Sequence, residues 1–428
     1  MSIRILSNGE RMPVLMDHQG VPLFYPTLFV TSQLRNAGAA VNTIRNKLED
    51  IRVLLRWEFL QQRSLLREMQ DSKWLTLPDV AALRDFAMLD MRVAKQDKRR
   101  QKEEGGRSVH GTGNACLPRA IVGVQQHYNR LTTIAEYLEF AGRVATQHRG
   151  SSAVRDEISR MVKSIRAHRP RGVTLRTDSR TIRDHCALKE TIERFMQVGS
   201  ENHQANPFAR SDVRLRNALI FGVLRCTGMR RGELLSLRID QLDLGHNPLI
   251  WVRRNQDDRH DTRRNQPVAK TMERPLSIAT EVAEMLQRYI MEVRASIAPA
   301  RKHPYLLVVH KKGKSYGQPL SISSLTNKIF GRMAAVDPAF SAIHPHVFRH
   351  NFNYELSVAI DRHNSEESCG AKVSEARELD IRAFLNGHRS RASGQVYNQR
   401  RVRELGDAAM RRIHEELLIK KERSDDAC

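Results

Sequence analysis

Two short boxes of basic residues in the second half of the chain have the composition that is needed to hold a phosphodiester. The first reads Thr227-Gly-Met-Arg230-Arg-Gly-Glu233-Leu-Leu, and the second reads His346-Val-Phe-Arg349-His350. Cleavage of a phosphodiester without a metal needs positive donors on the phosphate, a nucleophile and a proton donor for the leaving oxygen. An arginine guanidinium binds two phosphate oxygens at once and stays charged at any working pH, so Arg230 and Arg349 are the candidates for the first task.

The first box lies at a junction between two expected helices. An apolar helix ends at Thr227-Gly228 and a new helix begins after it, so Arg230 and nearby backbone N–H groups could face one anion together. Glu233 follows one helical turn later and could fix the guanidinium as a supporting ion pair. The alternative is that Arg230 is one more surface arginine among 71 basic residues.

The second box places a histidine beside its arginine. His346 precedes Arg349 by three residues, so both lie on one face of a helix that begins near Pro345. A histidine there can donate to a phosphate oxygen or accept a proton from the nucleophile, because it titrates near neutral pH. A metal site made by His344, His346 and the supporting His350 is the alternative, but no Asp, Glu or Cys accompanies them at ligand spacing.

Tyr397 is the candidate nucleophile. It follows the turn Asn386-Gly387-His388 and a short polar stretch, and it precedes a basic helix. A phenol is a poor nucleophile at its ordinary pKa, so it needs positive neighbours or a base, which the two arginines and His346 would supply. Most tyrosines, in contrast, are partly buried packing residues.

Lys270 is the candidate proton donor for the leaving oxygen. It lies in an expected β segment, where a lysine is more often simply solvated. Gly313-Lys314-Ser315 lacks the glycine five residues upstream that a phosphate-cradling loop requires, so the use of ATP is not supported. We therefore expect neither a cofactor nor a metal.

The elements that must position these residues are mainly helical, with a small antiparallel β-sheet in the second half. Apolar residues at helical spacing, including Ile44, Leu48, Ile51, Leu55 and Phe59, predict a helix from Val41. The other expected helices are Pro78–Val93, Ile121–Phe140, Asn217–Leu224, Thr280–Ala295, Ile322–Ala334, Pro345–Val358, Ser374–Leu385 and Arg401–Ile419. The expected β segments are Pro248–Arg253 and Pro267–Ile278, which enclose a very polar turn.

Length and composition predict four segments. A chain of 428 residues exceeds what one hydrophobic core usually organises. We expect a hairpin-like or irregular arm of unclear role at 1–40, a helical bundle at 41–165, a basic linker at 166–180 and a catalytic domain with a C-terminal helix at 181–428. The linker either passes along a DNA duplex or is an ordinary solvated tether. Residues 95–113 and 361–370 have the composition of loops.

The charge of the chain identifies the class of its partner. A net charge of +23 attracts polyanions, so the partner is expected to be nucleic acid, although a ribosomal or chromatin-like packing protein would have a similar charge. Five scattered cysteines, the absence of a secretory leader and the absence of a membrane-spanning apolar run predict a cytoplasmic protein, associated with the nucleoid.

In this order and spacing, the boxes resemble those of the tyrosine recombinase (phage integrase) family. The resemblance covers residues 180–428, with Lys270 ahead of Arg274-Pro-Leu and with Asn386-Gly-His388 followed by Tyr397. The helical N-terminal half looks like the core-DNA-binding domain of that family. Two departures are a very charged hairpin between Arg254 and Gln266, which leaves the choice of Lys270 open, and Leu-Asn-Gly-His388 in place of the commoner Leu-Gly-His.

The resemblance implies a recombinase, or integrase, that forms a C-shaped clamp around double-stranded DNA. Tyr397 would attack the scissile phosphate, leaving a 3′-phosphotyrosine and a free 5′ hydroxyl, without metal or ATP. Arg230 and Arg349 would hold the phosphate, His346 and His388 would bind it or manage the proton of the nucleophile, and Lys270 would protonate the leaving group.

The resemblance also implies a homo-tetramer on paired DNA sites, with accessory directionality factors as possible partners. The C-terminal helix has an apolar stripe of Leu405, Ala409, Ile413 and Leu417 that would dock on a neighbouring protomer or, alternatively, pack on its own domain. Two other functions fit the same residues: a type IB topoisomerase, and a catalytically silent DNA-binding accessory protein or repressor.

Overall fold

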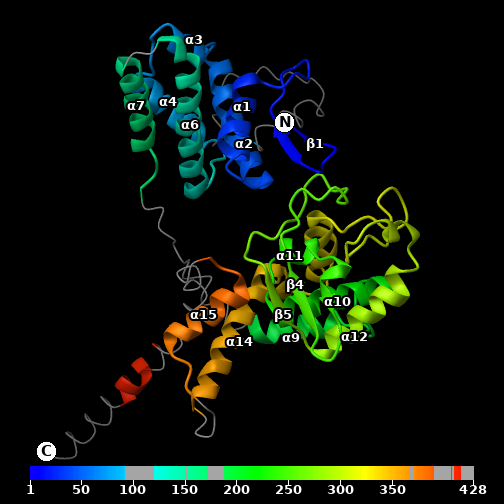
Figure 1. Ribbon diagram of the computed structural model, residues 1–428. Coiled ribbons are helices and arrows are strands. Elements are labelled where there is room, and N and C mark those ends of the chain that lie inside the picture. Colours follow the sequence, from blue (N-terminus) through cyan, green and yellow to red (C-terminus); the bar gives the residue numbers. More distant parts are fainter. Residues whose placement is uncertain are drawn as a thin grey trace, which may run out of the picture. The chain divides into compact units, whose positions relative to one another are not determined.

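The computed structural model of the chain describes residues 1–91, 120–149, 152–171, 188–365, 371–389, 406 and 409–415. The chain divides into two compact units (Figure 1). Met1–Leu6 and Arg11–Arg176 form the N-terminal unit, and Ser7–Glu10 and Thr177–Cys428 form the C-terminal unit. None of the described helices has both the length and the apolar character needed to cross a membrane.

The N-terminal unit consists of a short hairpin and a group of helices. The strands and helices are β1 (Ser2–Ile5), β2 (Arg11–Val14), α1 (Phe24–Phe29), α2 (Val41–Leu60), α3 (Leu65–Gln70), α4 (Leu77–Met88), α6 (Val124–Ala145) and α7 (Ser152–Ala167). The strands are antiparallel, with Ser2 opposite Val14. The helix at 24–29, which continues as a π-helical turn at Val30–Arg35, differs from the irregular arm that we expected beyond the hairpin.

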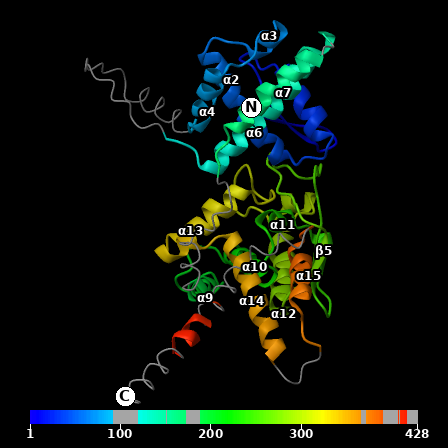
Figure 2. The same cartoon turned by 90° about the vertical axis from the view of Figure 1, so that its left-hand side faces the viewer.

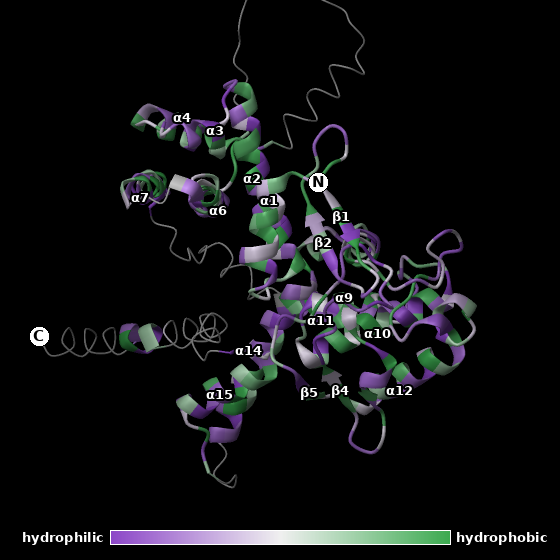
Figure 3. Cartoon of the chain, turned by 45° about the horizontal axis from the view of Figure 1, so that its top comes forward, coloured by the Kyte–Doolittle hydropathy of each residue, from purple (hydrophilic) through white to green (hydrophobic). Residues whose placement is uncertain are grey.

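The core of this unit is built from the apolar faces of α2, α4, α6 and α7, which are amphipathic (Figure 3). Ile44, Leu48 and Ile51 are fully buried, as the spacing predicted. Phe59 is 80% exposed and does not belong to the stripe, because it lies in the last turn of α2; Trp57 is buried there instead.

The C-terminal unit is mainly helical with one three-stranded antiparallel sheet, which confirms the expected fold class (Figure 2). Its sheet has the order β3 (Leu242–Asp243), β4 (Leu249–Val252), β5 (Arg274–Ser277). Its helices are α9 (Leu188–Val198), α10 (Ser211–Thr227), α11 (Arg231–Ser236), α12 (Thr280–Arg288), α13 (Gly331–Ala334), α14 (Pro345–Ser365) and α15 (Glu375–Asn386).

A cluster of phenylalanines fixes the helices that carry the basic boxes. The ring of Phe195 on α9 lies 4.9 Å from that of Phe221 on α10 and 5.9 Å from that of Phe348 on α14. All three side chains are buried. Since Phe348 directly precedes Arg349, this packing determines where that arginine points.

The second β segment is shorter than we expected, because the polar residues before it fold into a loop of their own. Within this loop the Arg263 guanidinium pairs with the Asp261 carboxylate at 2.7 Å and donates to the carbonyl of Leu235 at 3.0 Å. Both charged side chains are buried. The expectation that Lys270 lies in a strand is therefore wrong: β5 begins only at Arg274.

The C-terminal end of α14 also differs from the expectation. Helix α14 begins at Pro345 as predicted but continues to Ser365, so the first part of the expected loop at 361–370 is helical. Residues 409–415 are helical with exposed side chains, including Ile413. The loop at 95–113, most of the linker at 166–180, Tyr397, and Leu405 and Leu417 of the apolar stripe lie outside the described residues.

Candidate active site

Arg349 is a buried side chain that the ends of two helices hold in place. It is fully buried, and its Nη1 donates to the carbonyl of Gly228 at 3.0 Å while its Nη2 donates to the carbonyl of Asn386 at 3.0 Å. Gly228 ends α10 and Asn386 ends α15. The guanidinium therefore joins two helix C-termini, whose carbonyl groups carry partial negative charge.

Arg230 converges on the same carbonyl. Its Nη1 donates to the oxygen of Asn386 at 3.0 Å, so one neutral acceptor holds both guanidinium groups. The side chain of Arg230 is 33% exposed. Within the described part of the chain its contacts use Nη1, which leaves Nε and Nη2 for an anion from solvent.

Glu233 is the buried acceptor behind the arginines. Its Oε2 accepts the backbone N–H of Arg230 at 2.9 Å and Nη2 of Arg274 at 3.1 Å, and its Oε1 accepts the hydroxyl of Thr271 at 2.5 Å. Burial acts to raise the pKa of this carboxyl, but Arg274 and the hydrogen bonds outweigh it, so the pKa is lowered. Glu233 is therefore ionised at neutral pH.

Arg274 is a supporting residue that the sequence analysis did not identify. It is buried at the start of β5, where its Nε donates to the carbonyl of Leu385 at 2.8 Å and its Nη1 donates to the Thr271 hydroxyl at 3.0 Å. It thus ties the sheet to the end of α15. The one signal in the sequence for its role was its place in Arg274-Pro-Leu. That signal was weak, because an arginine at the edge of a short strand is usually solvated.

Asn386 connects α15 to α14 through its side chain. Its Nδ2 donates to Oδ1 of Asn353 at 2.6 Å, and its Oδ1 accepts from Nδ2 of Asn353 at 3.2 Å. Both side chains are buried. This reciprocal amide pair fixes the backbone carbonyl that receives the two arginines, so the asparagine that departs from the commoner Leu-Gly-His has a definite structural task.

His388 follows the glycine that ends α15 and faces Arg349. The Nη2 of Arg349 lies 3.3 Å from Nε2 of His388. Because the guanidinium can only donate, Nε2 is the acceptor and the neutral ring carries its proton on Nδ1. Burial, followed by the charges of Arg349 and Arg230, lowers the pKa of His388 to about 4, so it is neutral at pH 7.

The other histidines of the second box lie at the start of α14. The ring of His346 packs edge-on against that of His350, with 4.4 Å between centroids, and lies 6.4 Å from that of His344. Burial, with the charges of His344, Arg349 and Arg230, lowers the pKa of His346. Among the described residues, no group of three His, Cys, Asp or Glu side chains is placed to hold a metal ion.

Lys270 lies in the loop before β5 and is exposed, whereas Ala269 and Thr271 on either side of it are buried. Thr271 is bonded to Glu233, so the backbone at Lys270 is anchored next to the site. The structure therefore brings Arg230, Glu233, Arg349 and His388 together and leaves Lys270 beside them. Tyr397 is outside the described residues.

Comparison with known proteins gives a match over much of the segment that contains these residues. Residues 188–359 match the sequence profile of the phage integrase family. Among solved structures, the chain is similar to the XerA recombinase (17% identity, TM-score 0.33, 92% of this chain and 97% of that chain). It is also similar to the Tn1549 transposon integrase in complex with transposon right end DNA (16% identity, TM-score 0.46, 90% of this chain and 100% of that chain). A third similar structure is the XerH site-specific recombinase bound to palindromic difH substrate (17% identity, TM-score 0.37, 65% of this chain and 71% of that chain). No curated protein matches the chain in sequence.

Proposed function

From the match of residues 188–359 to the phage integrase family, we propose that the protein is a member of that family, a site-specific DNA recombinase that cuts and rejoins DNA through a bond to Tyr397. One observation carries the proposal: two guanidinium groups, Arg230 and Arg349, meet at a single neutral carbonyl oxygen. The Glu233 carboxylate lies behind them, 3.6 Å from Nη1 of Arg230, and leaves Nε and Nη2 of Arg230 for a phosphate group.

The chemistry requires no external energy source. The phenolic oxygen of Tyr397 attacks the phosphorus, the bond to the 5′ oxygen breaks, and a 3′-phosphotyrosine forms. The phenol proton passes to His346, whose lowered pKa keeps it neutral and able to accept, and the leaving 5′ oxygen takes a proton from Lys270. Attack by a 5′ hydroxyl of a partner duplex reverses these steps, because the covalent bond retains the energy of the phosphodiester.

The supporting residues act through the two arginines. Glu233 and Arg274 fix the position of Arg230 relative to β5, and the amide pair of Asn386 with Asn353 fixes the shared carbonyl. His388 is neutral and accepts a hydrogen bond from Nη2 of Arg349, so in this proposal it orients that guanidinium on the phosphate. In this proposal the catalytic set is Arg230, Lys270, His346, Arg349, His388 and Tyr397, with Glu233 and His350 in support.

At the level of the whole chain, we propose double-stranded DNA as the partner, with the helical N-terminal unit as a second DNA-binding part and a homo-tetramer on paired sites. The net charge of +23 supports a polyanionic partner. A supercoil relaxation assay distinguishes this proposal from a type IB topoisomerase: relaxation of a plasmid that contains no recombination site would favour the topoisomerase.

A nicked suicide substrate tests the cleavage step. The test uses duplexes from the DNA around the gene of this protein, each nicked close to a candidate scissile phosphate. Cleavage traps the covalent intermediate, because the short fragment that carries the free 5′ hydroxyl diffuses away. We expect a protein–DNA adduct that resists denaturing electrophoresis. Tyr397→Phe abolishes it while DNA binding is retained, and Tyr316→Phe, a control in the same unit, keeps it. A wild-type protein that forms no adduct on any of the duplexes, or an adduct that persists in Tyr397→Phe, would refute the proposal.

A further inference from the structure

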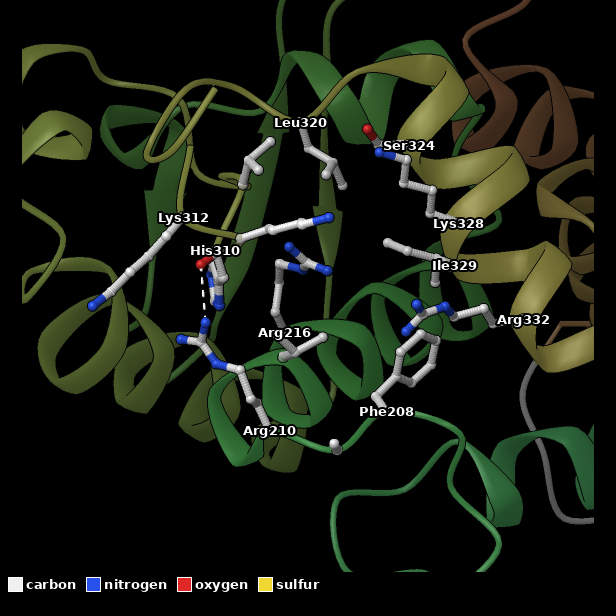
Figure 4. Close-up of a pocket in the computed structure, with 14 residues that line it drawn as sticks. Phe208, Arg210, Arg216, His310, Lys312, Leu320, Ser324, Lys328, Ile329 and Arg332 are labelled. Atoms are coloured by element: carbon white, nitrogen blue, oxygen red, sulfur yellow. Dashed lines mark hydrogen bonds between the residues drawn. The ribbon is translucent and has the colours of Figure 1, made fainter. Parts of the chain in front are cut away.

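A second basic site lies within the C-terminal unit, at the opposite end of α10 from Gly228. It is a pocket of about 670 Å³ between the first turns of α10, the segment around His310 and the π-helical turn Ser324–Phe330 that leads into α13 (Figure 4). None of its lining residues belongs to the catalytic set. Its volume is in the range of small-molecule sites.

The lining of the pocket combines an apolar floor with a cationic rim. Phe208, Leu320 and Ile329 supply apolar surface, and no Asp or Glu is among the described residues that line it. Of the rim cations, Arg210 is paired with Asp212 at 2.5 Å. Lys328 and Arg332 are exposed and have no ion pair with any described residue.

The centre of the pocket holds a buried arginine that no carboxylate neutralises directly. Arg216 is 6% exposed; its Nη1 donates to the carbonyl of Val308 at 3.0 Å, and its Nε and Nη2 donate to Oδ1 of Asn217 at 3.1 and 2.9 Å. Figure 4 shows this guanidinium pointing into the middle of the pocket, with Arg332 on the far side. The hydrogen bonds of this buried charge go to neutral acceptors, and Asp212, whose charge also acts on Arg216, is already paired with Arg210, so an anion in the pocket would offset the cost of burying the guanidinium.

We propose that this pocket binds a small organic anion: a molecule with one carboxylate, sulfonate or phosphate group on an apolar, ring-sized body. The anionic group lies against Arg216 between Lys328 and Arg332, and the body packs on Phe208, Leu320 and Ile329. Charge complementarity selects the anion, and the apolar floor selects a body that a bare phosphate backbone does not have. The inference is independent of the proposed recombination reaction.

Anilinonaphthalene sulfonate is a suitable probe, because it carries a sulfonate on an apolar aromatic body and becomes fluorescent on binding. We expect one saturable site per full-length chain. The double reversal Lys328→Glu with Arg332→Glu weakens binding by about tenfold or more, a loss of about 1.4 kcal/mol. The control reversal Arg301→Glu with Lys302→Glu, which changes the same charge at exposed positions away from the pocket, leaves binding unchanged.

Further measurements distinguish the anion from other occupants. The uncharged parent anilinonaphthalene binds about tenfold more weakly than the sulfonate if the charge is recognised. Arg216→Met, checked for folding by circular dichroism, also loses the probe. The proposal is overturned if the wild-type protein shows no saturable binding, if the rim reversal and its control behave alike, or if an unrelated DNA duplex displaces the probe, which would assign the pocket to the DNA surface.

Discussion

At the scale of the residue, the two phosphate-binding candidates are held differently, and substitution should reveal the difference. Arg349 is buried and spans two carbonyl groups, whereas Arg230 is one-third exposed and shares only the second of them. A residue that bridges two acceptors requires the planar fork of a guanidinium. Arg349 is therefore the residue at which even a conservative change is harmful.

We predict that Arg349→Lys slows formation of the covalent adduct about 100-fold or more, as does the loss of one donor in other oxyanion sites. The single ammonium group of a lysine cannot reach the carbonyl oxygens of Gly228 and Asn386 together, so the positive charge shifts away from the position that the guanidinium occupies. The rate is measured on the nicked duplex, with duplex affinity measured in parallel. Arg301→Lys, at an exposed position of the same unit outside the pocket, serves as the control. Adduct formation at the wild-type rate in Arg349→Lys would contradict the proposed role.

Glu233 permits a prediction about stability. Its substitution by glutamine leaves the buried Arg274 without its counter-charge, and breaking a buried pair in this way costs about 3 kcal/mol or more. We expect a clear decrease of the unfolding midpoint of the C-terminal unit in urea. Glu284→Gln, the same substitution at an exposed position of α12, should leave the midpoint nearly unchanged. Equal midpoints for the two variants would show that the buried carboxylate has no stabilising role.

The pKa of His388 predicts the direction of a pH effect. Burial and the neighbouring arginines lower it from 6.5 to about 4, so between these values the unfolded chain binds a proton that the folded chain does not. The stability that depends on neutral His388 is thus complete above pH 6.5 and decreases as the pH falls towards 4.

We therefore expect His388→Gln to lose less stability than the wild-type protein when the pH is lowered from about 7 to about 5. Urea unfolding at the two pH values measures the difference, and the exposed His246→Gln is the control. A His388→Gln variant with the same acid sensitivity as the wild type would show that His388 is already protonated in the folded state or does not differ from the unfolded chain.

At the scale of the element, the site is assembled by helix ends rather than by helix faces. Gly228 ends α10 with φ +57° and Gly387 ends α15 with φ +62°, both in the left-handed region that favours glycine. A Cβ on Gly387 would lie 2.5 Å from Nη1 of Arg274 and 2.7 Å from Cβ of Thr271. The turn therefore brings the backbone against the arginine that supports the site.

Gly387→Ala should accordingly cost more than the roughly 1 kcal/mol of left-handed strain alone, and it should reduce adduct formation because His388 shifts. Gly38→Ala is the matched control: Gly38 has φ +74°, and a methyl group added there would meet no atom within 4 Å, so only the strain applies. Thermal unfolding and the adduct assay compare the two variants. Equal effects would mean that the contact with Arg274 is unimportant.

Sequence patterns predicted the elements better than the contacts between them. The start of α14 at Pro345, the end of α10 at Gly228 and the strand β4 follow from local signals such as proline, glycine and β-branched runs. The burial of Arg274 and the amide pair of Asn353 with Asn386 depend on segments far apart in the chain, which one sequence without homologues cannot place side by side. The folded loop between β4 and β5 was missed for the same reason, because its order comes from the buried pair of Arg263 with Asp261.

At the scale of the whole molecule, the two units contribute different properties. Each has its own hydrophobic core, so each provides a rigid frame for the basic residues on its surface. The catalytic candidates belong to the C-terminal unit alone, while the net charge of +23 is a property of the complete chain. Affinity for DNA and cleavage of DNA should therefore respond to different changes.

Salt provides the test of this separation. Binding that neutralises about six phosphates weakens by about 10³-fold between about 50 mM and about 200 mM salt, because counterions are released from the duplex. We expect a dependence of this size for an unrelated duplex, measured by fluorescence anisotropy. Tyr397→Phe removes no charge and should show the same dependence of affinity on salt. Arg230→Ala, which loses one contact with a phosphate, should reduce the slope of log affinity against log salt concentration by about one. An affinity that is independent of salt would contradict a binding mode based on the basic surface, even if the chain still cleaved DNA.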